Sequence, residues 1–172
     1  APIFVQRGFN KLREMIYDFR VEGYASPEIT FLAEHMPRIS QEEYPSRPSK
    51  IVQLAYQNLN NNLLWVIDDN GSIFCCTRSR ENTVQAFHRH RLGGEYQGKF
   101  PKVLSIAATP SQDGTEDILW LLVKRTINEE DRVFLERMFP EFSGSTLFPE
   151  TNNRKNQPMF SDFSKFFKIK PV

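Results

Sequence analysis

The stretch that decides the fold is residues 63–79, LLWVIDDNGSIFCCTRS, in which two apolar runs flank a short polar segment. Each run has the length and the aromatic or β-branched content of a strand. Between them, Asn70 and Gly71 form a dipeptide that tolerates the positive φ angles of a two-residue type I′ turn. The stretch therefore predicts an antiparallel β-hairpin.

Two further segments resemble this hairpin. Residues 3–19, IFVQRGFNKLREMIYDF, place two apolar runs around Arg7-Gly8-Phe9-Asn10, and residues 118–138 place two around a looser polar connection at residues 128–131. Trp65 and Trp120 occupy matching places in the last two copies, 55 residues apart. This spacing is close to the length of a four-stranded propeller blade with long loops. We therefore expect both tryptophans to be core residues of successive blades.

Other strand-like runs precede and follow the hairpins, which gives the order that a propeller blade needs. The fold class predicted is all-β, with β-propeller-like blades of antiparallel sheet, two to three in number and part of a larger propeller, and a short helix. The predicted strands are residues 3–6, 12–18, 50–57, 63–68, 73–78, 84–90, 102–108, 118–125 and 132–137.

The helix is predicted at residues 27–36, because Ser26 is a suitable N-cap and Pro27 suits the first helical position. The prolines that follow indicate a surface connection up to residue 49. The predicted organisation is blade-like over residues 1–142, with a hairpin at 3–19, helix and connection at 26–49, a blade at 50–92 and a partial blade at 102–138. An irregular, Phe-rich, basic segment follows at 143–172.

The composition indicates no strongly charged partner. The chain has 172 residues, and 22 Lys and Arg against 21 Asp and Glu give a formal charge of +1, so no net field favours nucleic acid or an anionic membrane. No apolar stretch is long enough for a transmembrane helix, and residues 1–9 do not resemble a signal peptide. Because Ala1-Pro2 leads directly into an apolar run, we expect an excised domain or fragment.

The two cysteines, Cys75 and Cys76, are adjacent in a predicted strand. Their side chains should point to opposite faces, which disfavours a mutual disulfide. His88 and His90 lie two residues apart in another strand, so both imidazoles can face one side. Two ligands do not make a metal site, and although either cysteine could add a third, nothing in the spacing selects one. We predict no metal site and a structural role for both histidines.

No catalytic residue is predicted. Ser111-Gln112-Asp113-Gly114 is similar to the aspartate box of sialidase-type propellers, but such a box is a stabilising turn and lacks the intervening residue here. No phosphate-binding loop or Ser-His-Asp order is present, and the acidic residues cannot be paired into a glycosidase site. The prediction is therefore not an enzyme, and no cofactor. Basic residues near strand ends could line a pore or clasp a neighbouring subunit: Arg78, Arg80, Arg89, Arg91, Lys124, Arg125 and Arg137.

Several ordered motifs together resemble the tail nozzle, or phage stabilisation, proteins of tailed bacteriophages. They are FVQRG and KLREMIYDF, then SPEITFLAEHM, then LLWVIDDNGSIFCCTRSRENTVQAFHRHRLGG, then VLSIAATPSQDGTEDILWLLVKRTI and RVFLERM. The resemblance extends over residues 3–142, roughly four fifths of the chain. It implies propeller blades in a ring below the portal and adaptor.

The resemblance also implies a function. We expect a virion structural protein, made in the host cytoplasm, that contacts other tail, adaptor and portal subunits and forms a homo-oligomeric ring. DNA would be passing cargo, and no membrane partner is expected. The alternative is a ligand-binding or carbohydrate-binding propeller module, which would need more blades than are visible here to enclose a funnel.

The C-terminal residues 159–172 carry phenylalanines at helical spacing, including Phe163, Phe166 and Phe167. This stripe is typical of an amphipathic helix that docks on a partner or on the domain itself. Lys165 and Lys168 beside Asp162 give only a modest cationic character, so a bilayer is the less favoured partner.

Overall fold

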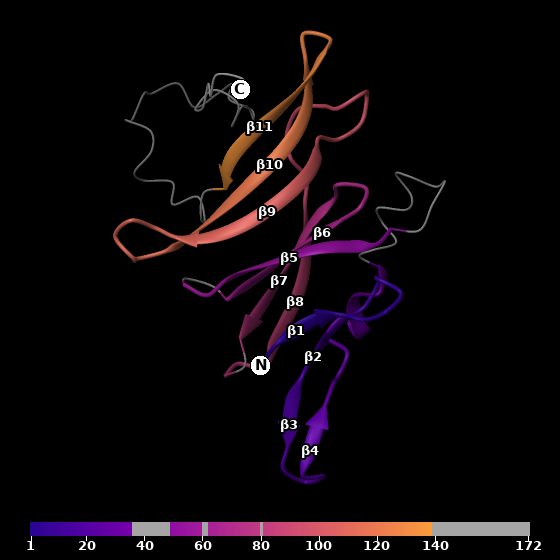
Figure 1. Cartoon of the computed structure of the whole chain (residues 1–172), viewed down its shortest axis with the longest axis vertical. Coiled ribbons are helices and arrows are strands. Elements are labelled where there is room, and N and C mark those ends of the chain that lie inside the picture. Colours follow the sequence, from indigo (N-terminus) through magenta and orange to yellow (C-terminus); the bar gives the residue numbers. More distant parts are fainter. Residues whose placement is uncertain (36–48, 60–61, 80, 139–172) are drawn as a thin grey trace, which may run out of the picture. The chain divides into compact units, whose positions relative to one another are not determined.

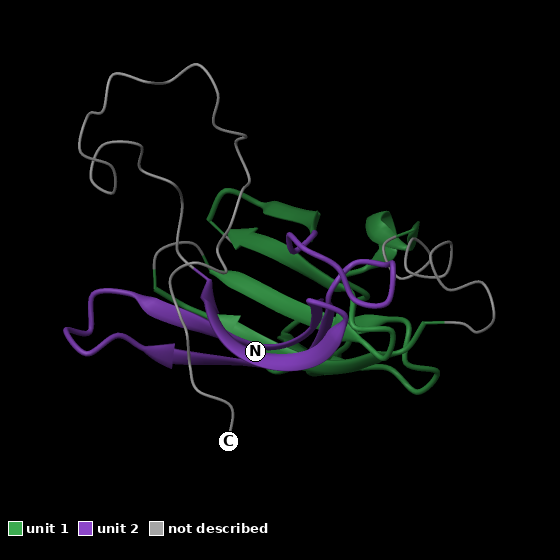
Figure 2. Ribbon diagram, turned by 90° about the horizontal axis from the view of Figure 1, so that it is seen from above, with its two compact units in different colours: residues 1–90 green, residues 91–172 purple. Residues whose placement is uncertain are grey.

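The computed structural model describes residues 1–35, 49–59, 62–79 and 81–138. These residues form antiparallel β-sheets of two, two, four and three strands, with a single short 3₁₀-helix among them (Figure 1). The all-β prediction is therefore confirmed. Two compact units divide the chain, residues 1–90 and residues 91–172, which Figure 2 colours separately.

The four-stranded sheet of the first unit is a meander. Its strands are β5 (Ile51–Gln57), β6 (Leu63–Asp68), β7 (Ile73–Ser79) and β8 (Val84–His90), and they lie in chain order. Each strand pairs antiparallel with the next. The predicted strands of this region are correct to within one residue at every end.

The turn between β6 and β7 differs from the predicted type I′ turn. Gly71 has a φ of 87°, but Asn70 does not have a positive φ. The Gly71 amide donates to the Asp68 carbonyl, and the Asp68 carboxylate accepts the amides of Asn70 and Ser72 at 3.0 and 2.9 Å. A carboxylate that accepts hydrogen bonds from these amides favours a turn longer than the two-residue type I′ turn, with glycine at its last position. Asp68 itself is buried and also accepts the Ser49 hydroxyl at 2.6 Å.

One face of this sheet forms the main core of the first unit. Leu64 and Val66 of β6 lie beside Phe74 and Cys76 of β7, and Leu12 from the N-terminal segment packs into the same cluster. All are at most 3% exposed. Burying such side chains stabilises the fold by roughly 1.5–3 kcal/mol each, before ordering costs.

The N-terminal residues form two small hairpins. The hairpin predicted at 3–19 is present over residues 3–14, and only its extension to residue 19 is wrong. β1 (Ile3–Val5) pairs with β2 (Leu12–Glu14), and β3 (Ile16–Asp18) pairs with β4 (Gly23–Ala25). The predicted strand at 12–18 is broken at Met15, whose amide donates to the Pro2 carbonyl. The strand with which the chain pairs therefore changes at Met15, from β1 to β4, although the apolar pattern of the sequence continues.

The helix predicted at 27–36 is also wrong where it is described. Only Phe31–Ala33 forms a turn of 3₁₀-helix, η1. Upstream, Glu28 bridges to Arg13, and the Ile29 amide donates to the Leu12 carbonyl at 2.9 Å. The β-bridge holds Glu28 as a sheet partner of β2 where the helix would have begun, so tertiary pairing overrides the capping signal.

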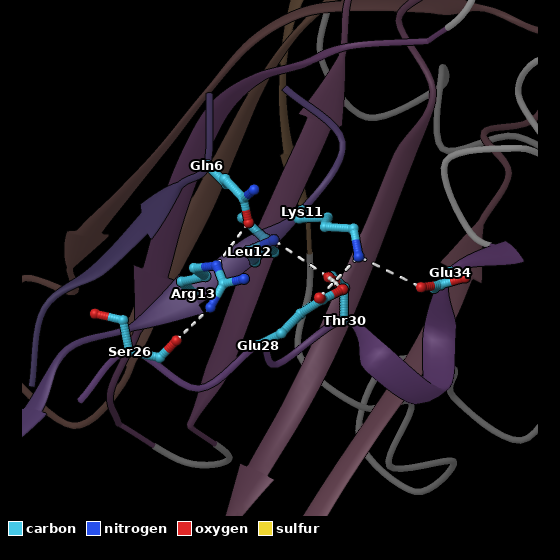
Figure 3. A network of polar contacts seen from close by, with 8 residues as sticks. All are labelled: Gln6, Lys11, Leu12, Arg13, Ser26, Glu28, Thr30 and Glu34. Carbon is cyan, nitrogen blue, oxygen red and sulfur yellow. Dashed lines mark hydrogen bonds and ion pairs between the residues drawn. The ribbon is translucent and has the colours of Figure 1, made fainter. Parts of the chain in front are cut away.

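Side chains reinforce this attachment (Figure 3). The Leu12 amide donates to the Thr30 hydroxyl at 3.2 Å, and Lys11 Nζ lies 2.9 Å from the Glu28 carboxylate. The ion pair raises the pKa of Lys11 and lowers that of Glu28. Arg13 donates to the Gln6 side chain and to the Ser26 carbonyl, both at 2.6 Å. The segment 26–30 is thereby held along β2.

The second unit contains a three-stranded antiparallel sheet. β9 (Lys102–Pro110), β10 (Asp117–Ile127) and β11 (Glu130–Met138) again follow chain order, with β10 in the centre. Asn128 and Glu129 join β10 to β11 with φ angles of 52° and 65°. A two-residue loop with two positive φ angles is a type I′ turn. The connection predicted to be loose is therefore a tight two-residue turn, and it lacks glycine.

Trp65 and Trp120 occupy corresponding strands but not corresponding environments. Each lies on the second strand of its sheet, opposite an alanine of the strand before, Ala55 and Ala107 respectively. Trp65 is 3% exposed, as predicted, whereas Trp120 is only partly buried and donates from its indole to Thr109 Oγ1. The prediction of a core role for Trp120 is wrong, because the buried side chains of β10 are on the other face.

Candidate functional site

The predicted pair of histidines lies on one face of the four-stranded sheet. His88 stands opposite Cys75 on β7, which in turn stands opposite Trp65 on β6. His88 Nδ1 lies 2.8 Å from His90 Nε2, and the rings of Trp65 and His90 are 4.8 Å apart. Thr77 Oγ1 lies 3.1 Å from His88 Nε2. The expectation that both imidazoles share a face is confirmed.

Burial governs the protonation of this pair. It lowers the pKa of His90 to about 4, with a smaller contribution from His88, and it also lowers the pKa of His88. Both rings are therefore neutral near pH 7, so that an N–H of one ring donates to a bare nitrogen of the other.

The histidines meet only part of the requirement for a metal centre. Cys75 shares their face, but burial raises its pKa to about 12, which keeps the sulfur protonated. No group of three or more His, Cys, Asp or Glu within the described ranges is arranged to hold a metal ion. Cys76 points to the opposite face, into the core cluster, and neither thiol is in a disulfide.

Asp113 organises the loop between β9 and β10. Its Oδ1 accepts the Ser111 hydroxyl at 2.6 Å and both the amide and the hydroxyl of Thr115. These hydrogen bonds, that from Ser111 first, lower the pKa of Asp113 to about 2. The Gly114 amide donates to the Ser111 carbonyl, with Gly114 at a φ of 68°. The loop that resembles an aspartate box is thus a carboxylate-centred turn.

Most of the predicted basic residues take part in ion pairs within their own unit. Arg78 lies 2.6 Å from Glu14, Arg125 makes two hydrogen bonds to Glu136 at 2.7 and 2.8 Å, and Arg137 lies 2.6 Å from Glu116. Arg125 also donates to the Gly93 carbonyl. Arg80, and the phenylalanines Phe163, Phe166 and Phe167, lie outside the described residues.

Lys124 Nζ also lies 3.9 Å from the Asp131 carboxylate, and both Lys124 and Arg91 contact aromatic rings. Lys124 Nζ lies 4.9 Å from the centre of the Tyr96 ring, and the Arg91 guanidinium lies 4.5 Å from that of Phe100. Such cation–π contacts fix the course of residues 91–101 beside the sheet. The predicted pore-lining set is therefore not gathered into one cluster by the described contacts.

The sequence reasoning missed an exposed cluster of aromatic side chains in the first unit, the aromatic hairpin, which we define as residues 15–25. Phe19 is 85% exposed, Tyr24 75% and Tyr17 46%. Tyr17 stands opposite Tyr24 across the strands, and its ring contacts that of Phe19 edge to face at 4.9 Å. In Figure 1, β3 and β4 extend away from β1 and β2. The alternation Ile16-Tyr17-Asp18-Phe19 was the available signal.

The second unit also presents apolar side chains, on what we call the apolar sheet face. Leu122 of β10 stands opposite Leu135 of β11, and Val133 and Trp120 lie on the same side of the sheet. Leu122, Val133 and Leu135 are 36%, 50% and 45% exposed. The opposite side carries the buried Leu119, Leu121 and Val123.

No described helix is both long enough and apolar enough to cross a membrane. The sequence matches no protein-family model, and no curated protein is significantly similar to it.

Proposed function

We propose that the chain is a structural module of a virion, part of the tail nozzle or head–tail closure assembly of a tailed bacteriophage, and that it acts through protein–protein contacts. The observation that carries the proposal is the four-stranded meander β5–β8, followed along the chain by the second meander β9–β11. Successive antiparallel meanders in chain order are the organisation of propeller blades. The link to phage tails comes from the motif resemblance described above.

The side chains support an assembly role. Buried ion pairs such as Arg78–Glu14 and Arg125–Glu136 stiffen each unit, while aromatic and aliphatic side chains remain exposed on both. Exposed aromatic residues are typical of protein–protein contact sites. In this proposal the partners are other tail, adaptor and portal subunits and further copies in a ring, with DNA passing through.

The test is the composition of purified particles. Mass spectrometry of gradient-purified phage should find the protein in fixed stoichiometry with the portal protein, and immunogold labelling should place it at the tail. Native mass spectrometry of the full-length protein should show a closed ring. Absence from washed particles would overturn the proposal, and selective binding on a glycan array would favour the carbohydrate-binding alternative.

A further inference from the structure

We propose that the aromatic hairpin of one copy docks on the apolar sheet face of the next copy, so that one contact repeats around the ring. This inference rests on the proposed function, because it names the surfaces that would join the copies. The two surfaces belong to different units and have different shapes, a protruding hairpin and an extended sheet. A contact between unlike surfaces is heterologous, and heterologous contacts close into rings when the rotation permits.

The size of the hairpin surface fits an interface anchor. An aromatic side chain buries about 200 Å², so exposures of 46%, 85% and 75% for Tyr17, Phe19 and Tyr24 leave roughly 400 Å² to cover. Val21, 68% exposed, adds to it. One side of a standard interface buries about 800 Å². The three clustered rings thus supply about half of the area that one side of a standard interface buries. Aromatic residues are also among those that contribute most to binding energy.

The rings are also held ready for binding. Tyr17 packs edge to face against both Phe19 and Tyr24, at 4.9 and 5.5 Å. Asp18 fixes the turn, because its carboxylate accepts the Arg20 amide at 2.9 Å and pairs with the Arg20 guanidinium. Side chains that are already ordered lose less conformational entropy on association.

The apolar sheet face offers a surface of matching chemistry. Leu122, Val133 and Leu135 present contiguous aliphatic groups across two paired strands. Beside them, Lys124 stands opposite Lys102 on one neighbouring strand and opposite Val133 on the other, and Lys124 pairs with Asp131 at 3.9 Å. Lys102, Lys124 and Asp131 together carry a net charge of +1. The hairpin carries Asp18 and Glu22 against Arg20, a net charge of −1. Acidic and basic surroundings therefore oppose each other around an apolar centre, which favours this pairing over self-association of two hairpins.

A photocrosslinking experiment tests the contact directly. A benzophenone amino acid replaces Phe19 in the full-length protein, copies labelled with ¹⁵N and ¹⁴N are mixed and assembled, and the crosslinked peptides are sequenced. Crosslinks should join Phe19 of one isotopic copy to residues 119–137 of the other. The matched control carries the probe at Tyr56, 45% exposed on β5, and should not give these crosslinks.

Charge substitutions supply the second measurement. Leu135→Arg should weaken self-association at least tenfold, while Val84→Arg, at 43% exposure on β8, should not. Circular dichroism melts of both variants should match the parent. A ring whose hairpin crosslinks elsewhere, within its own copy or to another protein, overturns this inference but leaves the virion role intact. A monomeric protein that is absent from particles overturns both.

Discussion

The two larger sheets each have a central strand with a continuous apolar run, but they bury these runs differently. In β6 every residue from Leu64 to Asp68 is buried, on both faces of the strand. In β10 the buried residues alternate, and Trp120 and Leu122 remain partly exposed or exposed. A strand that is covered on both faces usually has a continuous apolar sequence. β10 has such a sequence, although one of its faces is partly exposed to solvent. The surplus apolar surface of β10 is what indicates an external contact.

The largest test of this contrast uses the two tryptophans. We expect Trp65→Ala to lower the free energy of unfolding by about 3–5 kcal/mol, because it opens a cavity in a closed core. Trp120→Ala should cost about 1 kcal/mol, since it removes a partly exposed ring and one hydrogen bond. Urea denaturation of each variant measures both values. Equal costs would show that the sheets do not differ in burial.

The second test concerns the buried ion pair of the first unit. Arg78 and Glu14 join strands 64 residues apart in the sequence, with side chains 12% and 8% exposed. Arg78→Met should cost about 3 kcal/mol, because the buried Glu14 carboxylate loses its charge-assisted hydrogen bond from the Arg78 guanidinium at 2.6 Å.

Two variants control for this effect. The double variant Arg78→Met, Glu14→Leu should recover most of the loss. Arg132→Met, which breaks an exposed pair in the second unit, should cost below about 1 kcal/mol. A double variant no more stable than Arg78→Met would contradict the electrostatic explanation.

The third test is the contribution of histidine to acid sensitivity, which should arise in the four-stranded sheet because the three-stranded sheet contains no histidine. The pKa of His90 is about 4 in the folded chain, below its ordinary 6.5. The unfolded chain therefore binds more protons in this range, so stability is full above pH 6.5 and is lost as pH falls towards 4.

We expect the loss at His90 to be about 1–2 kcal/mol, after allowance for solvent screening. Urea denaturation at pH 7 and pH 4.5 should show it in the parent chain. His90→Phe should narrow the difference between the two pH values, and an unchanged difference would assign the acid sensitivity to other groups.

The smallest test compares the two hairpin turns. Glu129 has a φ of 65° without being glycine, so Glu129→Gly should stabilise the chain by about 0.5–1 kcal/mol. Gly71→Ala should destabilise it by about 1 kcal/mol, because Gly71 has a positive φ, which alanine adopts only with strain. Thermal melts decide the sign, and a destabilised Glu129→Gly variant would contradict the type I′ assignment.

The strands of both meanders were predictable, because long apolar runs separated by polar turns suffice to locate them. The break at Met15 was not, since residues 12–19 continue the apolar pattern while their hydrogen-bond partner changes. The helix after Ser26 failed for a related reason: Glu28 forms a β-bridge with Arg13 of β2. Local sequence indicates the conformation that a segment prefers on its own. These two outcomes depended instead on pairing with backbone groups elsewhere in the chain.

The candidate sites show the same division. Period-two alternation correctly placed His88 and His90 on one face. The hydrogen bond between them and their lowered pKa values depend on burial, which the spacing does not contain. The aromatic hairpin was overlooked because its residues have the composition of a core, and only the tertiary structure shows them exposed.

Adjacent cysteines on opposite faces give the first unit a pair of chemical reporters. Alkylating reagents attack the thiolate, and burial raises the pKa of Cys75 to about 12 and of Cys76 to about 11. Labelling of the native chain should therefore be slow at both. A pulse of iodoacetamide followed by peptide mass mapping would record which thiol becomes reactive first. The order of modification would reveal whether the side bearing Trp65 or the side bearing Leu12 loosens earlier during unfolding.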